Sequence, residues 1–285
     1  MDKLIYWVEQ NPKITLAQLK ERFQQLDQPV SFSIETIRKR LDGQLFTLKK
    51  VRNEPENANS EIYKAKRQAY ARRYLELQSE RRAVLFLDET NFNLFISRSS
   101  GRSVASTRCT SIAAGSKGRN IHLIGAISNF GWSYFETRRG SFDSVCARDF
   151  VERLLLQAKL IYPEGATLVV DNAPCHSQIE LVLDNPELDN FEILRLGPYS
   201  PMLNPIEHIW SIIKSAVKRM HAENIRDLLR GEDRGQTSCQ EYRIQAIEGY
   251  IESGLREVNP AKIMSCVAHV QSHLAAAINC EEMIF

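Results

Sequence analysis

Two short apolar runs, each ending in an aspartate, constrain the fold of this chain more than any other feature. Ala83–Asp88 reads Ala-Val-Leu-Phe-Leu-Asp, and Thr167–Asp171 reads Thr-Leu-Val-Val-Asp. Apolar runs of this length without polar alternation predict strands that are buried on both faces of a sheet. A sheet covered on both faces needs helices between its strands, so the sequence predicts an α/β domain.

The remaining pattern places further elements around these two strands. The predicted elements are strands at Ile121–Ser128 and Trp132–Thr137, a helix over 143–160, a helix over 176–184, a strand at Phe191–Leu196 and a helix over 204–220. Three antiparallel strands followed by alternating helices and strands is the order of the ribonuclease H-like fold. We therefore predict a mixed sheet with flanking helices over residues 83–222.

The first 52 residues predict three short helices. Thr15 with Gln18 forms a capping-box pattern for the second, and Ser33 can cap the third. Three short helices of which the last is basic indicate a helix-turn-helix, whose third helix enters the major groove of DNA. Packing of three helices with no DNA role is the alternative. The candidate DNA-binding residues are Thr36, Arg38, Lys39, Arg40, Lys49 and Lys50.

The charge of the chain is unevenly distributed, although the total is only +2. Residues 1–82 hold 17 Lys/Arg against 11 Asp/Glu, residues 83–222 hold 14 of each, and residues 223–285 hold 6 against 10. A basic first third favours a nucleic-acid-binding module. Residues 53–82 are predicted to be a linker and a basic helix that tracks phosphates or is simply solvated. Residues 223–285 are predicted to be a helical tail that begins with an insertion.

The two strand-terminal acids are candidate metal ligands. Acids at the carboxyl ends of neighbouring strands converge where ligands bind in α/β sheets. Because paired carboxylates repel each other, a divalent cation relieves the repulsion, and oxygen ligands favour Mg²⁺ or Mn²⁺ over zinc. Glu207 lies in the first turn of the 204–220 helix, which the Asn204 side chain can cap with Pro205 at the first helical position. Taken alone, Glu207 is interpreted as a structural residue, because the helix dipole stabilises a negative charge in the first turn.

Three motifs together resemble a known family. They are Phe-Leu-Asp88-Glu-Thr, Val-Asp171-Asn-Ala-Pro-Cys-His176 and Pro-Tyr-Ser-Pro-Met-Leu-Asn-Pro-Ile-Glu207-His-Ile-Trp, with 35 residues between Asp171 and Glu207. Over about residues 30–220 the chain resembles the DDE transposases of the mariner superfamily. The resemblance implies that Asp88, Asp171 and Glu207 form an acidic triad in a ribonuclease H-like core. It also implies double-stranded DNA as the partner, both as transposon ends and as target, and a homodimer.

The implied chemistry is metal-dependent cleavage and transfer of DNA strands. Three carboxylates that hold two Mg²⁺ or Mn²⁺ ions can activate water or a 3′-hydroxyl for in-line attack on a phosphodiester. Asn172 and His176 are candidates for supporting the acids, and a plain helix-start role is the alternative for His176. Glu89 is the nearest rival of Asp88, because strand alternation points adjacent side chains to opposite faces and only one of the two can face the site. Because clustered acids repel each other, we expect Asp88→Asn, Asp171→Asn and Glu207→Gln each to hold or raise stability without metal.

Two other functions remain open at the level of sequence. Members of the family usually carry two helix-turn-helix units and only one is visible here, so a domesticated or truncated DNA-binding protein without activity is an alternative. A general ribonuclease fits the fold but not the helix-turn-helix. The six cysteines form no Cys-x-x-Cys pair, so a zinc site is not expected. The sequence predicts neither a signal peptide nor a membrane span, and the family role implies a nuclear location in a eukaryotic host.

Overall fold

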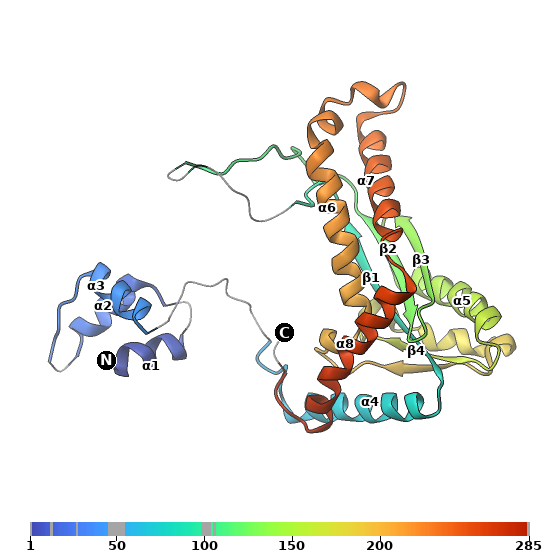
Figure 1. Ribbon diagram of the computed structural model, residues 1–285, viewed down its shortest axis with the longest axis horizontal. Coiled ribbons are helices and arrows are strands. Elements are labelled where there is room, and N and C mark those ends of the chain that lie inside the picture. The colour runs from blue at the N-terminus through green and yellow to red at the C-terminus, as the bar shows by residue number, and fades with distance from the viewer. Residues whose placement is uncertain are drawn as a thin grey trace. The chain divides into compact units, whose positions relative to one another are not determined.

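The structure of the chain, a computed structural model, describes residues 2–11, 14–26, 28–44, 55–97, 104 and 107–283 (Figure 1). The chain divides into two compact units, Met1–Pro55 and Glu56–Phe285. Lys49 and Lys50, which were predicted to bind DNA, lie outside the described residues. None of the helices in the described residues is long and apolar enough to cross a membrane.

The first unit consists of α1 (Asp2–Gln10), α2 (Leu16–Gln24) and α3 (Ile34–Asp42). The predicted caps are confirmed, because Thr15 and Gln18 form a capping box and the Ser33 side chain accepts from the Thr36 amide. Four buried apolar residues form its core: Leu4, Leu19, Phe23 and Ile37. Residues 25–33 join α2 to α3, a longer connection than the three- or four-residue turn of a typical helix-turn-helix.

The second unit is built on a five-stranded sheet in the order β3-β2-β1-β4-β5. The strands are β1 (Ala83–Phe92), β2 (Ile121–Ser128), β3 (Ser133–Arg139), β4 (Ala166–Val170) and β5 (Glu192–Arg195). The first three are antiparallel, and β4 and β5 run parallel to β1. The predicted ribonuclease H-like mixed sheet is confirmed. β1 continues four residues beyond Asp88, because Glu89–Phe92 keep their pairing with β2.

Alternation along β1 separates the two faces of the sheet. Ala83, Leu85 and Leu87 join the core under α5 (Ser144–Ile161). Val84 and Phe86 join the opposite core. That second core is covered by α4 (Glu61–Ser79), α6 (Ile206–Arg230), α7 (Cys239–Leu255) and α8 (Pro260–Ile278) (Figure 1).

Helix α4 belongs to this unit and is not part of a linker. Its Tyr74 ring packs on Phe86 of β1 at 5.7 Å between ring centroids. Gln68 donates from Nε2 to the Ile278 carbonyl at the end of α8. Arg67, predicted to lie on a basic surface, is 1% exposed and donates to the Ala58 carbonyl and to Asn59 Oδ1. The basic face of α4 is therefore smaller than its sequence indicated.

The predicted boundary at residue 222 falls inside α6, which continues to Arg230. The helix goes on because Leu228 is buried in the core, and it ends at Gly231, whose φ of 66° suits a glycine. Residues 223–230 thus form the last part of α6. The acidic tail packs on the sheet of the second unit, since Arg139 of β3 pairs with Glu241 and Glu248 of α7.

The segment predicted as a helix over 176–184 forms shorter 3₁₀ turns at Pro174–His176 and Ile179–Asp184. Ile179 and Val182 are both buried and join the core under α5. Residues three apart share one side of a 3₁₀ turn, so this tighter turn buries both side chains together. The segment lies directly after β4, and its conformation sets the position of His176.

Candidate active site

The sheet register brings Asp88 and Asp171 to the same level. Phe86 of β1 pairs with Val169 of β4 in a parallel ladder. Asp88 and Asp171 each lie two residues further along their strands, where β4 has just ended. Both carboxylates line one cleft at this edge of the sheet. The convergence predicted from the sequence therefore follows from the parallel pairing of β1 with β4.

Asp88 is positioned by a hydrogen bond from an indole, and a glycine opposite it leaves room for the ring that packs on this indole. Trp210 of α6 donates from Nε1 to Asp88 Oδ2 at 2.8 Å. Gly125 of β2 pairs with Asp88, and a Cβ at this glycine would lie 2.1 Å from the Phe135 ring. The absence of a side chain lets Phe135 cross over Gly125 and pack edge-on against Trp210 at 5.9 Å. Gly125 therefore makes room for the residues that fix Asp88.

Glu207 enters the cleft from the first turn of α6. The prediction that the Asn204 side chain caps this helix is wrong. Asn204 is 3% exposed and donates from Nδ2 to the Leu87 carbonyl of β1 at 3.3 Å. The Asn204 backbone carbonyl, not its side chain, accepts from the Glu207 amide. The hydrogen bond to Leu87 turns the Asn204 side chain inward, and it ties the start of α6 to the strand that carries Asp88.

The three acids share a cleft of about 910 Å³. Asn172 also lines it and donates from Nδ2 to the Leu196 carbonyl, which holds the ends of β4 and β5 together. Lys66 and Tyr63 of α4 also line the cleft. A second hollow of about 350 Å³ continues from Glu207 along α6 past Lys214 and Lys218. Basic residues thus border the acidic centre.

The electrostatics of Asp88 and Glu207 reflect crowding of negative charge. Burial, with the nearby charge of Glu207, raises the pKa of Asp88 to about 7, although the Trp210 hydrogen bond opposes the shift. Loss of water around Glu207 and the charge of Asp171 raise the pKa of Glu207, while Lys214 opposes the rise. Both groups are therefore destabilised as carboxylates unless a cation is near.

The pKa of Asp171 shifts in the opposite direction, which argues against the sequence-based expectation for Asp171→Asn. Burial alone would raise its pKa, but hydrogen bonds from His176 and from the Ala173 amide outweigh burial and lower it. Asp171 Oδ1 lies 2.5 Å from His176 Nδ1 and 3.0 Å from the Ala173 nitrogen. Asp171→Asn would keep an oxygen that can accept these bonds but would remove the charge that strengthens them, so it should lower the stability of the metal-free protein.

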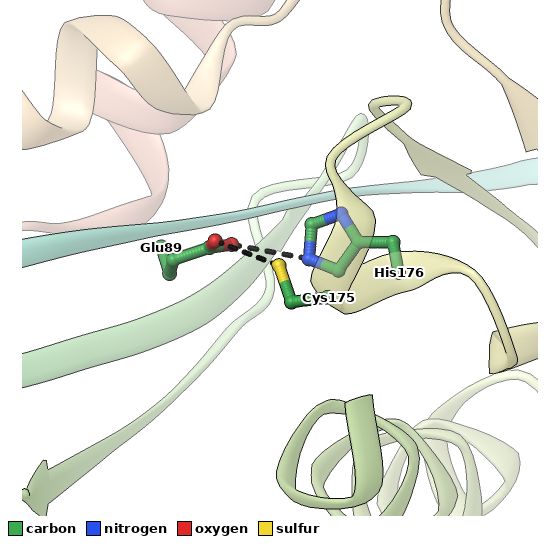
Figure 2. Close-up of side chains that lie close together, drawn as sticks. All are labelled: Glu89, Cys175 and His176. Carbon is green, nitrogen blue, oxygen red and sulfur yellow. Dashed lines mark hydrogen bonds and ion pairs between the residues drawn. The ribbon is translucent and has the colours of Figure 1, made fainter. Parts of the chain in front are cut away.

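His176 stands behind the cleft, with its side chain only 1% exposed. Its Nε2 lies 3.1 Å from Glu89 Oε2, and Cys175 Sγ donates to Glu89 Oε1 at 3.2 Å (Figure 2). Burial disfavours the imidazolium, but the bonds to Asp171 and Glu89 prevail and raise the pKa of His176 to about 9. Burial and the nearby Glu89 raise the pKa of Cys175 to about 12.

Sequence reasoning treated Glu89 only as a rival of Asp88 and assigned no function to Cys175. Glu89 does face away from the cleft, as alternation predicts, and yet it reaches Asp171 through His176. Cys175 and His176 are adjacent in the Asp171-Asn-Ala-Pro-Cys-His176 motif, which was the one local signal of a cluster. Their meeting with Glu89 depends on the 3₁₀ turn after β4.

The predicted DNA-binding residues of α3 are arranged unequally. Arg38 pairs with Glu35 and Asp42 of its own helix at 2.6 and 2.7 Å. The Thr36 hydroxyl shares a hydrogen bond with Ser33 in the cap. Lys39 is exposed, and Arg40 lies over the Phe32 ring at 4.6 Å. Lys39 and Arg40 are thus better placed than Arg38 to meet a phosphate.

A known protein family matches the part of the chain that carries the three acids. The family model described as DDE superfamily endonuclease matches residues 83–229, about half of the chain, which includes the whole sheet and all three acids. The chain belongs to the DDE superfamily endonucleases. No curated protein matches the sequence.

Solved structures share the fold of this DDE endonuclease over nearly its whole length. The Mos1 mariner paired-end complex with Mn has a TM-score of 0.63 at 14% identity, with 97% of this chain and 77% of that chain covered. The corresponding complex with Mg has a TM-score of 0.58 at 17% identity, covering 96% and 77%. The Mos1 transposase paired-end complex with left transposon end has a TM-score of 0.57 at 19% identity, covering 94% and 78%. At these identities the likeness shows a common fold.

Proposed function

We propose that this chain is a mariner-type DNA transposase that cleaves DNA strands and joins them to a target through Asp88, Asp171 and Glu207. The observation that carries the proposal is that three acids from β1, β4 and α6 line one cleft. The fold shared with Mos1 complexes that contain a transposon end supports it. The alternative of a DNA-binding protein without activity is less well supported, because all three acids are present and placed together.

The residues of the cleft fit divalent cations. Asp88 and Glu207 have raised pKa values because burial and neighbouring carboxylates disfavour their charges. An all-carboxylate donor set favours Mg²⁺ or Mn²⁺, and we propose two ions held by Asp88, Asp171 and Glu207. Bound there, such ions supply Lewis-acid activation of the attacking hydroxyl and neutralise charge on the phosphate.

The protein's own contribution is to position the acids before DNA arrives. Trp210 fixes one oxygen of Asp88. In the described part of the chain both hydrogen bonds to the Asp171 carboxylate fall on Oδ1, so Oδ2 is proposed to be the oxygen that holds a metal ion. His176 and Asn172 are proposed to support Asp171, one through its carboxylate and the other through the strand ends. Such orientation lowers the reorganisation needed for in-line attack.

The basic residues around the cleft are proposed to hold the DNA backbone. Lys66 borders the cleft on α4, and Lys214 with Lys218 borders the hollow along α6. Phosphate contacts of this kind position a duplex without reading its sequence. In the first unit, α3 with Lys39 and Arg40 is proposed to enter the major groove at the transposon end. Paired ends imply a homodimer, and a nuclear location follows if the host is eukaryotic.

The test combines nicking with strand joining. Full-length protein should nick supercoiled plasmid with Mg²⁺ or Mn²⁺ and join a labelled 3′-hydroxyl oligonucleotide to it, and EDTA should abolish both. Asp88→Asn and Glu207→Gln should lose at least 10³-fold in nicking, on the order of an essential electrostatic group. DNA binding should persist in both variants.

Glu187→Gln is the matched control, because this exposed acid lies in the 3₁₀ turn Pro186–Leu188, beside Lys159 of α5 and outside the cleft. It should nick at the wild-type rate. Activity that survives EDTA, or persists in Asp88→Asn, would show that the three acids are not the active site. Binding without cleavage under all metal conditions would favour the inactive alternative. Lys39→Ala should weaken binding alone and reduce its salt dependence by about one counterion.

A further inference from the structure

Behind the acidic cleft, three side chains with different donor atoms point toward one another. Glu89 comes from β1, and Cys175 with His176 comes from the turn after β4 (Figure 2). One ligand atom from each lies within 4.8 Å of the other two. His176 Nε2 is buried and has no well-aligned hydrogen bond, although it faces Glu89 Oε2 at 3.1 Å.

We propose that Glu89, Cys175 and His176 form a binding site for Zn²⁺ or a similar transition-metal ion, separate from the carboxylate cleft. The proposal goes beyond the transposase function and does not depend on it. A thiolate, an imidazole and a carboxylate are the ligand types that zinc takes in proteins. Mg²⁺ prefers an all-oxygen set and has no use for the sulfur and nitrogen found here.

The distances in the cluster suit a tetrahedral ion. Bond lengths of about 2.0–2.3 Å place neighbouring ligands of a tetrahedral zinc about 3.5 Å apart. The Cys175 sulfur lies 3.2 Å from Glu89 Oε1, and His176 Nε2 lies 3.1 Å from Glu89 Oε2. Small rotations of the side chains would open the centre for the ion. The Glu89 side chain is 22% exposed, so water can reach the fourth position.

The second nitrogen of His176 provides independent support. Histidines that bind metals usually donate their other ring N–H to a carboxylate, which fixes the tautomer and the ring orientation. His176 Nδ1 is held in this way by Asp171 Oδ1 at 2.5 Å. The arrangement therefore leads from the Asp171 carboxylate through the His176 imidazole to the sulfur of Cys175 and the oxygens of Glu89. A metal there would fix His176 and, through it, Asp171.

Binding balances in both charge and protons. If Glu89 is counted as a carboxylate, Cys175 as a thiol and His176 as an imidazolium, these three side chains without metal have a net charge of zero. Zn²⁺ displaces one proton from Cys175 Sγ and one from His176 Nε2, and both protons leave to solvent. The cluster with Zn²⁺, a thiolate, a carboxylate and a neutral imidazole again has zero net charge. A buried site can accept this exchange because no net charge is added to the protein interior.

The test uses Co²⁺ as a spectroscopic probe, since it occupies zinc sites and shows a thiolate charge-transfer band in the near ultraviolet. Full-length protein is titrated with Co²⁺ in excess Mg²⁺, so that the carboxylate cleft is already filled. We expect one Co²⁺ per chain with a thiolate band, and displacement of Co²⁺ by Zn²⁺. Cys175→Ser should abolish the band. Glu89→Gln should weaken affinity about 10-fold or more, since even outer-shell changes cost that much.

Cys266→Ser is the control, because Cys266 lies one turn from His269 on α8 and His269 contacts His208 at 4.7 Å between ring centroids. This variant should keep the band. Protection of Cys175 from alkylation by Zn²⁺, mapped by mass spectrometry on the wild type, tests the site without any substitution. No thiolate band, a band that survives Cys175→Ser, or alkylation of Cys175 unchanged by Zn²⁺ would overturn the proposal. None of these readouts involves DNA, so failure of the transposase function would leave them unaffected.

Discussion

Asp88→Asn should stabilise the metal-free protein, and the gain should grow with pH. The pKa of Asp88 rises from 3.8 to about 7 on folding. A group whose pKa is raised in the folded state contributes stability below its unfolded pKa and loses it as the pH rises through the folded value. The native state therefore weakens between about pH 4 and pH 7, because the carboxylate must ionise beside Glu207 and away from water.

The magnitude follows from the size of the pKa change. Each pKa unit corresponds to 1.36 kcal/mol, so the ionised carboxylate lowers the free energy of unfolding by up to about 4 kcal/mol above pH 7. Asparagine has the same shape and carries no charge, and its oxygen can still accept from Trp210. We expect the stability difference between Asp88→Asn and wild type to widen by about 2–3 kcal/mol between pH 5 and pH 8.

Urea unfolding in EDTA at both pH values measures this difference. Asp171→Asn is the contrasting variant, because His176 and the Ala173 amide lower the pKa of Asp171. It should lose about 1–3 kcal/mol, because an uncharged amide oxygen accepts from His176 more weakly than the carboxylate does. Saturating Mg²⁺ should reduce the advantage of Asp88→Asn, since a bound cation stabilises the native carboxylates. If the difference between Asp88→Asn and wild type does not change with pH, the electrostatic account of Asp88 is wrong.

Two further predictions address the support of the site and its contact with DNA. Gly125→Ala should destabilise the protein by about 1–3 kcal/mol and slow nicking, because its Cβ would lie 2.1 Å from the Phe135 ring. The control is Gly249→Ala on α7, whose Cβ would have nothing within 4 Å and which should be neutral or stabilising by up to about 1 kcal/mol. Equal melting temperatures of the two variants would contradict this prediction. Lys66→Ala should weaken DNA binding and lower the salt slope by about 1, whereas Arg72→Ala, exposed on the same helix outside the cleft, should have a smaller effect. Equal salt slopes for Lys66→Ala and wild type would refute the phosphate contact.

Local patterns in the sequence determined most of the secondary structure. The strands around Ala83–Asp88, Ile121–Ser128 and Thr167–Asp171 follow from short apolar runs, and the caps at Thr15 and Ser33 follow from side chains that bond within a few residues. The order of strands and helices also predicted the mixed sheet. These features could be predicted because each depends on interactions between residues close in the chain.

The convergence of the acids needed one step beyond local pattern. The sequence placed Asp88 and Asp171 at strand ends, but only the pairing of Phe86 with Val169 puts them at one level. Asn204 shows the limit of local rules. Its helix-start pattern predicted a side-chain cap, and the contact with the Leu87 carbonyl, far away in sequence, decided otherwise.

Only the tertiary structure determined the surroundings of each acid and, through them, the direction of its pKa shift. Asp88 and Asp171 look alike in sequence, as aspartates after apolar strands. Asp88 has buried surroundings with acids beside it, while Asp171 receives hydrogen bonds from a turn whose tight form was not predicted, and their pKa values move in opposite directions. The meeting of Glu89 with Cys175 and His176 has the same origin. The sequence fixes which donor atoms exist, but their convergence arises from packing between β1 and the turn after β4, and packing between distant segments leaves no local pattern.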